Sequence, residues 1–355
     1  MTVPFQVGVM QLTMEPVSKM IDTAKALDHY GFDSLWLAEA YPWWRTHGVE
    51  VRSATALAPL LAQATTNLKI GWGIIGSYAR HPLVTAMDVR VVQEMAGPDR
   101  FYCGIGASKI LMNAIGQGDD SKSRPRTNVD ETLRIVRATL DGEKLDFEGR
   151  EYTAVAPELD PNAEVPDWKV PLYVGGGGPR MMQTAGELAD GLITPSLTSP
   201  AFYPYAIEHM RKGAEKANRK VEDLDLGATL IASCGPDRES GRRGARELLG
   251  RYLVNKARNI RGSGDMLFEK AGLSPAELMP VVEAIERNGN KVIPDVVTDE
   301  IMDKTKVIAG TPEEVADLII EHRDSGCRHV QLELWGDDRE AQIKLIGEKV
   351  LPRVK

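Results

Sequence analysis

Apolar residues in this chain form short continuous runs that alternate with longer stretches of helical spacing. Between residues 16 and 30, Val17, Met20 and Ala24 fall on one helix face, and a glycine follows at the end. Apolar runs of strand length recur along the whole chain. We expect eight strands, at residues 5–10, 34–39, 68–75, 101–106, 172–174, 191–195, 226–233 and 329–334.

Because helical patterns separate these strands, the sequence predicts a parallel sheet built from βα units. Eight such units are the number that closes a (β/α)8 TIM barrel. A doubly wound open sheet is the alternative, and the strand count favours the barrel. We therefore expect one barrel domain over residues 1–355.

Two stretches depart from the simple βα alternation. Residues 141–169 contain prolines and a charged turn, and they read as a hairpin-like excursion. Residues 237–304 are too long for one βα unit and predict a helical insertion between strands seven and eight, across the barrel mouth. Ser274 and Thr311 have the spacing of capping boxes, so helices are expected to begin there.

A glycine turn follows the fifth predicted strand and precedes Pro179, a typical first residue of a helix. Its members are Gly175, Gly176, Gly177 and Gly178. A glycine turn that opens a helix directs several backbone N–H groups at one point, at the positive end of the helix. An anion, most often a phosphate, is the expected ligand. A glycine-rich turn without a ligand is the alternative.

The loop after the second predicted strand begins with Glu39 and continues to Trp43 and Trp44. A carboxylate followed by two tryptophans suggests an aromatic wall for a flat or apolar ligand, so both tryptophans are candidate substrate-pocket residues. In the alternative interpretation, the glutamate forms a salt bridge at the rim and the tryptophans cap the core.

Glycines also cluster at the ends of the third and fourth predicted strands. They are Gly71, Gly73, Gly76, Gly104 and Gly106. Glycine in a barrel strand costs packing and indicates a bulge or the close approach of a ligand. We expect a planar cofactor against this bare backbone, with its phosphate at the four-glycine turn.

Composition narrows the class of protein. The net charge of −8 argues against a nucleic-acid-binding surface. Three separated cysteines suggest neither a disulfide framework nor a zinc site, and no other metal site is indicated. We see no signal peptide and no apolar run long enough to span a bilayer. A cytoplasmic protein with a small-molecule substrate is expected.

Four segments resemble the luciferase-like flavin and deazaflavin oxidoreductases. They are residues 73–82, 94–106, 175–180 and 308–315. The resemblance extends over essentially the whole chain and is closest to the branch that uses coenzyme F420. Within that branch, the chain looks most like methylenetetrahydromethanopterin reductases and phthiodiolone ketoreductase-type proteins.

The resemblance assigns roles to single positions. It implies a cis peptide between Gly73 and Ile74, behind the central cofactor ring. It places the phosphate turn at residues 176–178 and a further cofactor contact at Thr194. It also puts Glu39 near the edge of the deazaflavin.

Two positions depart from the sugar-phosphate dehydrogenases of this branch. Those enzymes have a histidine where this chain has Ala40, and a glutamate where it has Ser108 and Lys109. These differences argue against oxidation of glucose-6-phosphate.

The resemblance implies hydride transfer between the deazaflavin and an organic substrate such as a ketone, an imine or a pterin, without oxygen. Reduction of a carbonyl or imine needs a proton donor, and the candidates are Glu39, Tyr78 and Lys109. Each has a simpler interpretation: a bond to the cofactor edge, packing, or pairing with a cofactor phosphate. His81 precedes a predicted helix and is interpreted as a capping or ring-edge residue.

Two other functions remain open at this point. One is an FMN-dependent monooxygenase on the same barrel, and the other is a non-catalytic member that binds the cofactor as a carrier. The family resemblance also implies a homodimer, although the sequence identifies no interface.

Overall fold

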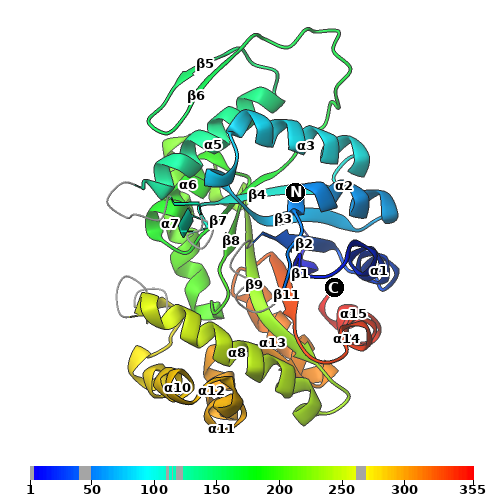
Figure 1. The fold of residues 1–355 in the computed structure, drawn as a ribbon, viewed down its shortest axis with the longest axis vertical. Helices are drawn as coiled ribbons and strands as arrows, with labels where there is room; N and C mark the ends of the chain where they lie inside the picture. Colours follow the sequence, from blue (N-terminus) through cyan, green and yellow to red (C-terminus); the bar gives the residue numbers. More distant parts are fainter. Residues whose placement is uncertain (1–3, 40–48, 109–111, 114, 117–122, 261–268) are drawn as a thin grey trace.

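The computed structural model describes residues 4–39, 49–108, 112–113, 115–116, 123–260 and 269–355. Eight parallel strands form a closed barrel, because β8 pairs with β9 and completes the ring β9-β11-β1-β2-β3-β4-β7-β8 (Figure 1). The predicted TIM barrel is therefore confirmed. The strands are β1 (Gln6–Leu12), β2 (Ser34–Ala38), β3 (Lys69–Gly76), β4 (Phe101–Gly106), β7 (Leu172–Gly175), β8 (Gly191–Thr194), β9 (Asp225–Cys234) and β11 (His329–Leu334).

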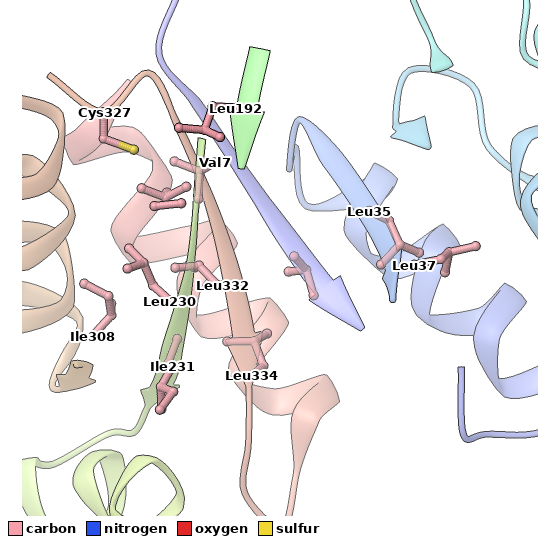
Figure 2. Packing of buried hydrophobic residues seen from close by; sticks show 14 of the residues in the cluster. Val7, Leu35, Leu37, Leu192, Leu230, Ile231, Ile308, Cys327, Leu332 and Leu334 are labelled. Carbon is pink, nitrogen blue, oxygen red and sulfur yellow. The ribbon is translucent and has the colours of Figure 1, made fainter. Parts of the chain in front are cut away.

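Helices surround the barrel, as the alternating pattern predicts. They are α1 (Val17–His29), α2 (Ala54–Ala64), α3 (Pro82–Ala96), α5 (Pro125–Leu140), α6 (Pro179–Leu188), α7 (Tyr203–Lys216), α13 (Pro312–Asp324), α14 (Arg339–Leu345) and α15 (Leu351–Val354). Strand side chains that point outward form one apolar layer with the buried helix faces. Figure 2 shows part of this layer, with Leu35 and Leu37 from β2 and Leu332 from β11.

The inside of the barrel is filled by the side chains that alternate with this layer. Its middle holds a smaller cluster that includes Trp36, Tyr102 and Tyr173, with Ile74 packed against it. The Trp36 and Tyr102 rings stack with centroids 5.2 Å apart. Because these aromatic side chains occupy the middle, a ligand has access only from an end of the barrel.

The excursion predicted at residues 141–169 contains an antiparallel hairpin of β5 (Leu145–Glu148) and β6 (Thr153–Ala156). It projects from the barrel beside α5 and α3 (Figure 1). Tyr152 ties it to the end of β3, since its hydroxyl donates to the carbonyl oxygen of Ser77 at 2.7 Å.

The predicted insertion after the seventh barrel strand contains α8 (Arg238–Ile260), α10 (Pro275–Asn288), α11 (Ile293–Val296) and α12 (Asp299–Thr305). These helices lie together at one side of the barrel (Figure 1). Before α13, the chain adds β10 (Ile308–Gly310), which pairs with β9 outside the ring and was not predicted.

Of the two predicted capping boxes, only one forms. At Thr311, the side chain accepts from the N–H of Glu314, and the Glu314 carboxylate accepts from the N–H of Thr311. At Ser274 a helix does begin, but the serine side chain makes no capping bond. The spacing alone therefore located both helix starts but not both caps.

Candidate functional site

The residues singled out from the sequence gather at the carboxyl ends of neighbouring strands. Glu39 directly follows β2, Gly73 and Ile74 lie near the end of β3, Gly106 ends β4, and Gly175 ends β7. These strands are consecutive in the barrel order β2-β3-β4-β7. Because the carboxyl ends of parallel strands share one face of a barrel, the positions form one side of its mouth.

Ile74 lies at a bulge near the end of β3. The peptide bond between Gly73 and Ile74 is cis, as the family resemblance implies. The pairing of β3 with β4 shifts register between Trp72 and Ile75. Gly73 and Ile74 are partly exposed, whereas the residues on either side of them are buried. The bulge therefore exposes part of the Ile74 side chain at the barrel mouth.

Two of the glycines of β4 and β7, Gly106 and Gly175, are explained by this isoleucine, and Gly104 is explained by the backbone of Trp72. A Cβ added at Gly175 would lie 2.6 Å from Cγ2 of Ile74, and one at Gly106 would lie 3.0 Å from its Cδ1. A Cβ at Gly104 would lie 2.0 Å from the carbonyl oxygen of Trp72 and 3.4 Å from Cγ2 of Ile74. The expectation that these three glycines leave open space for a cofactor needs correction, because Ile74 occupies the space beside Gly106 and Gly175 and the Trp72 carbonyl occupies the space beside Gly104. The surface offered to a ligand here is Ile74 itself.

The start of α6 is open, in contrast to these positions. Gly178 is the N-cap, Pro179 is the first helical residue, and no described side chain caps this end. A Cβ at Gly178 would meet no atom within 4 Å in the part of the chain that the structure describes, whereas one at Gly176 would lie 2.6 Å from Cγ of Met181. The first N–H groups of a helix have no acceptor within it and lie at its positive end. This geometry suits an anion, as the sequence predicts.

Glu39 is held in a two-pronged ion pair with Arg80. Both guanidinium nitrogens donate to its two carboxylate oxygens at 2.8 Å, and the pair is largely buried. The hydrogen bond with Glu39 raises the pKa of Arg80, so the guanidinium stays charged. The N–H of Glu39 also donates to the carbonyl oxygen of Ile74 at 3.3 Å. The structure therefore agrees with the salt-bridge interpretation of Glu39. Trp43 and Trp44 lie outside the described residues.

Of the other two proton-donor candidates, the structure describes Tyr78 but not Lys109. The Tyr78 hydroxyl accepts from the backbone N–H of Arg124 at 3.0 Å, and burial raises the pKa of Tyr78. Lys109 lies outside the described residues. His81 is the N-cap of α3, and its ring accepts from the N–H of Leu83 at 3.3 Å. The capping interpretation of His81 is confirmed.

Thr194, the expected cofactor contact at the end of β8, is fully buried. Its hydroxyl lies 3.0 Å from that of Thr198 and has a partner within the protein. A cofactor contact at Thr194 stays a prediction.

The arrangement as a whole joins a bulged third strand to a glycine turn at the start of a helix after β7. The family model described as luciferase-like monooxygenase matches residues 1–329, most of the chain. The chain belongs to the luciferase-like family.

Curated members of the luciferase-like family resemble the chain over nearly its full length. The 5,10-methylenetetrahydromethanopterin reductase of Methanolobus tindarius is 27% identical over 347 residues, covering 97% of this chain and 99% of the relative. The F420-dependent glucose-6-phosphate dehydrogenase of Nakamurella multipartita is 27% identical over 342 residues, covering 95% and 93%.

Among solved structures, the coenzyme F420-dependent tetrahydromethanopterin reductase from Methanopyrus kandleri superimposes with a TM-score of 0.82. The two chains are 24% identical, and the match covers 99% of this chain and 100% of the other. At this level of identity, the likeness establishes the shared fold.

Sequence reasoning missed a row of polar side chains inside this luciferase-like barrel. Along β11, His329, Gln331 and Glu333 are all buried. His329 lies near the amino ends of the strands, 3.6 Å from the carboxylate of Asp225, which also accepts from the Tyr173 hydroxyl at 2.7 Å. Burial alone would raise the pKa of Asp225, but His329 and Tyr173 outweigh it and lower that pKa.

A signal for this row was present in the sequence. Polar residues at every second position of a strand, within a barrel whose opposite strand face is apolar, indicate a polar interior. Metal ligation is not indicated there, since no group of three or more suitable side chains lies close enough among the residues with described positions. Nor does any helix in the described ranges have the length and apolar character to cross a bilayer.

Proposed function

We propose that this protein is a coenzyme F420-dependent oxidoreductase. It transfers a hydride between the deazaflavin and an organic substrate, such as a ketone, an imine or a pterin-like molecule, without oxygen. The observation that carries the proposal is the placement of a partly exposed isoleucine at a strand bulge beside an uncapped helix start. Relatives named for F420-dependent activity, similar over nearly the whole chain, support the choice of cofactor.

The residues present suit such a cofactor. Ile74 offers an apolar surface for one face of a flat ring, and an apolar cluster supports it from below. The start of α6 provides uncapped N–H groups and open space at Gly178 for a phosphate. Ile74 lies near the carboxyl end of β3, and α6 follows the carboxyl end of β7. Only β4 separates these two strands in the barrel. A ring on Ile74 and a phosphate at α6 therefore belong to one binding mode.

When bound, F420 supplies the hydride chemistry, and the protein supplies position, charge and exclusion of water. Ile74 orients the ring from one side, and the N–H groups at the start of α6 bind the phosphate. The bond from the Glu39 N–H to the Ile74 carbonyl fixes the bulge. Since Arg80 occupies both Glu39 oxygens, Glu39 acts here as a positioning residue for the bulge.

An FMN-dependent monooxygenase is the second candidate, because FMN also combines a flat ring with a phosphate. The family description as luciferase-like monooxygenase favours it. The full-length similarity to a methylenetetrahydromethanopterin reductase and to an F420-dependent dehydrogenase favours the deazaflavin.

Titration of the purified protein with F420 and FMN, followed by ligand fluorescence, separates the two candidates. We expect F420 to bind at micromolar concentration and FMN to bind at least about tenfold more weakly, a difference of about 1.4 kcal/mol. The same preparation should then oxidise reduced F420 without oxygen when given a ketone, an imine or a methylene-bridged pterin. Tight binding of FMN alone would overturn the proposal, and F420 binding without transfer to any of these substrates would support a carrier role.

The curated relatives include both pterin reductases and glucose-6-phosphate dehydrogenases, and two sequence positions favour the first group. Ala40 replaces the histidine of the sugar-phosphate dehydrogenases, and Lys109 stands near the position of their glutamate. We therefore place the substrate among ketones, imines and pterins and exclude glucose-6-phosphate. In the transfer assay, glucose-6-phosphate serves as the negative control.

A homodimer forms part of the proposal, and α3 provides its interface. Val84, Met87, Val91 and Met95 of α3 are all exposed although they are apolar, and Leu60 of α2 is exposed beside them. Their spacing places the α3 residues on one face, opposite the residues that α3 buries in the core. A helix that is apolar on two faces indicates burial against a partner, and a second copy of the chain is the partner that we propose.

We also place the protein in the cytoplasm. Cys103, Cys234 and Cys327 are free and buried. Free thiols are typical of a reducing compartment.

A further inference from the structure

The inner face of β11 carries a polar side chain at each of three successive inward positions. His329 lies at the lower end, where its Nε2 is 3.1 Å from the Ser34 hydroxyl. Gln331 lies above it and beside the bulge, because a Cβ at Gly73 would be 3.5 Å from its Oε1. Glu333 follows two residues later on the same face, about 7 Å further along the strand. Glu333 therefore lies toward the carboxyl end of the barrel, one pleat above the level of Gly73.

The carboxyl group of Glu333 has a phenol as its hydrogen-bond partner. The Tyr252 hydroxyl of α8 donates to Oε2 of Glu333 at 2.8 Å. The Ser196 hydroxyl, just after β8, hydrogen-bonds to the same phenol. Tyr252 therefore connects the ends of β8 and β11 with the helical insertion that follows β9.

The second carboxyl oxygen of Glu333 has no hydrogen-bond partner in the part of the chain that the structure describes. Oε1 is buried and makes no hydrogen bond to any described residue, and only 4% of the Glu333 surface is exposed. No lysine or arginine pairs with Glu333 in the described ranges, and Tyr252 is the one ionisable group that acts on it. A buried carboxylate without a cation is costly, so the neutral acid is favoured.

The position of the acid proton follows from these contacts. Because the Tyr252 hydroxyl already donates to Oε2, the proton of the neutral acid belongs on Oε1. Burial raises the pKa of Glu333 to about 7, and burial also raises the pKa of Tyr252 well above its usual value, so the phenol keeps its proton. An acid with a pKa near neutrality both gives up and regains a proton readily.

We propose that Glu333 is the proton donor of the hydride-transfer reaction and that Tyr252 is its positioning residue. The inference rests on the proposed function and deepens it. Among the candidates considered from the sequence, Glu39 has both oxygens bound by Arg80, whereas the Tyr78 hydroxyl accepts from the N–H of Arg124 and keeps its own proton, so Tyr78 stays the alternative donor. Glu333 instead has a buried oxygen on the inner face of the barrel, toward its carboxyl end, that has no hydrogen-bond partner among the described residues.

The proposed step is balanced in atoms and charge. Hydride addition to the carbon of a C=O or C=N bond reduces that carbon and oxidises the hydride donor. The π electron pair moves to the oxygen or nitrogen, which takes the proton from Oε1 of Glu333. Glu333 is left as a carboxylate that Tyr252 stabilises through Oε2, and water returns the proton. In the reverse direction, the carboxylate accepts the proton from an alcohol or amine.

The test compares wild type with E333Q, which keeps the shape of the side chain but carries no acid proton. Infrared spectra of the ligand-free protein across a pH series should show a protonated carboxyl band that titrates near pH 7 and is absent from E333Q. F420 affinity, measured by fluorescence titration, should change less than about twofold. Single-turnover hydride transfer to a ketone should slow about 100-fold or more, and the pH-rate limb near neutrality should disappear.

Two further variants separate a proton donor from a structural residue. Y252F keeps the acid but removes the hydrogen bond that stabilises its carboxylate, so both the infrared titration and the rate limb should move to higher pH. E208Q, at an exposed position of α7, is the matched control, and it should leave every readout unchanged. A merely structural Glu333 would give a lower melting temperature in E333Q without a change in the pH-rate limb, and that result overturns the proposal.

The outcomes also distinguish this inference from the function on which it rests. If wild type transfers hydride and E333Q does so at the same rate, the role of Glu333 is wrong and the proposed function stands. If wild type binds no F420, the proposed function is wrong and the proton-donor role falls with it.

Discussion

Ile74 is the residue around which the proposed ring site is built. Its side chain occupies the space beside glycines of two neighbouring strands, and its remaining surface is open at the barrel mouth. An isoleucine held on several sides has few alternative rotamers. The glycines therefore contribute by fixing Ile74 rather than by leaving a gap for the ligand.

Gly175→Ala tests whether the neighbouring glycines fix the Ile74 side chain. The new Cβ would lie 2.6 Å from Cγ2 of Ile74, so we expect a loss of stability of about 1–3 kcal/mol and weaker F420 binding. Denaturant unfolding and fluorescence titration measure the two effects. In an Ile74→Ala background, Gly175→Ala should reduce stability much less, because Cγ2 of residue 74 is no longer present.

Gly178→Ala is the matched control, since its Cβ meets no described atom within 4 Å and its φ of −87° suits alanine. Its effect on stability should stay within about 0.5 kcal/mol. Equal losses at Gly175 and Gly178 would contradict the view that Ile74 decides which glycines are required.

Some residue-scale features could not be predicted from the sequence. Glu39 and Arg80 are 41 residues apart, and only the folded barrel brings an oxygen of one to a nitrogen of the other. The sequence left the salt bridge open as one of two interpretations, and it named no partner. The alternating polar residues of β11 indicate that Glu333 faces the barrel interior, but they carry no information on its contact with Tyr252 of α8.

At the scale of elements, the start of α6 is the decisive feature. Its N-cap is a glycine with β-region angles and free space around it. Ser, Thr, Asp and Asn are the side chains that commonly accept from N–H groups at this position, and glycine has no side chain to do so. The absence of one leaves the N–H groups to a ligand.

Gly178→Asp should separate helix stability from anion binding. Aspartate is a good N-cap, so stability should remain within about 0.5 kcal/mol of wild type or improve slightly. Its negative charge would occupy the place of the phosphate, so F420 affinity should fall at least about tenfold, or 1.4 kcal/mol. Isothermal titration with F420 and thermal unfolding measure both effects.

Gly178→Asn provides a cap of the same size without the charge. It should weaken F420 binding less than the aspartate does. Unchanged affinity in Gly178→Asp would show that the phosphate binds elsewhere.

Element boundaries were well predicted where apolar periodicity is strong. The strands β4 and β11 begin and end at the expected residues, and the hairpin and the insertion lie where the pattern breaks. The three-residue β10 was missed because so short a run has no period of its own. At Ser274, the sequence fits a capping box, yet its side chain makes no capping bond, which spacing cannot reveal.

The whole molecule combines the proposed cofactor site at the barrel mouth with an exposed apolar face on α3. The barrel itself was predictable because strand number and helix alternation restrict the topology to few choices. The proposed dimer interface could not be predicted from the sequence. Helix periodicity shows that α3 is apolar, but it does not show which face of α3 the core leaves exposed.

Met87→Asp should weaken the homodimer. Met87 is 68% exposed, so the monomer tolerates the charge, whereas a buried interface does not. We expect light scattering after size exclusion to show a dimer for wild type and mostly monomer for the variant. Val155→Asp, at a 71% exposed apolar position on the hairpin, is the control and should remain dimeric. A wild-type monomer at micromolar concentration would refute the interface.

The most direct test of the account is a crystal structure of the protein with F420 bound. We expect the deazaflavin ring against the open face of Ile74 and the phosphate at the N–H groups that begin α6, with the free ring face turned toward Glu333. A cofactor bound away from Ile74, or a phosphate far from Gly178, would contradict the central claim that the β3 bulge and the α6 start form one cofactor site.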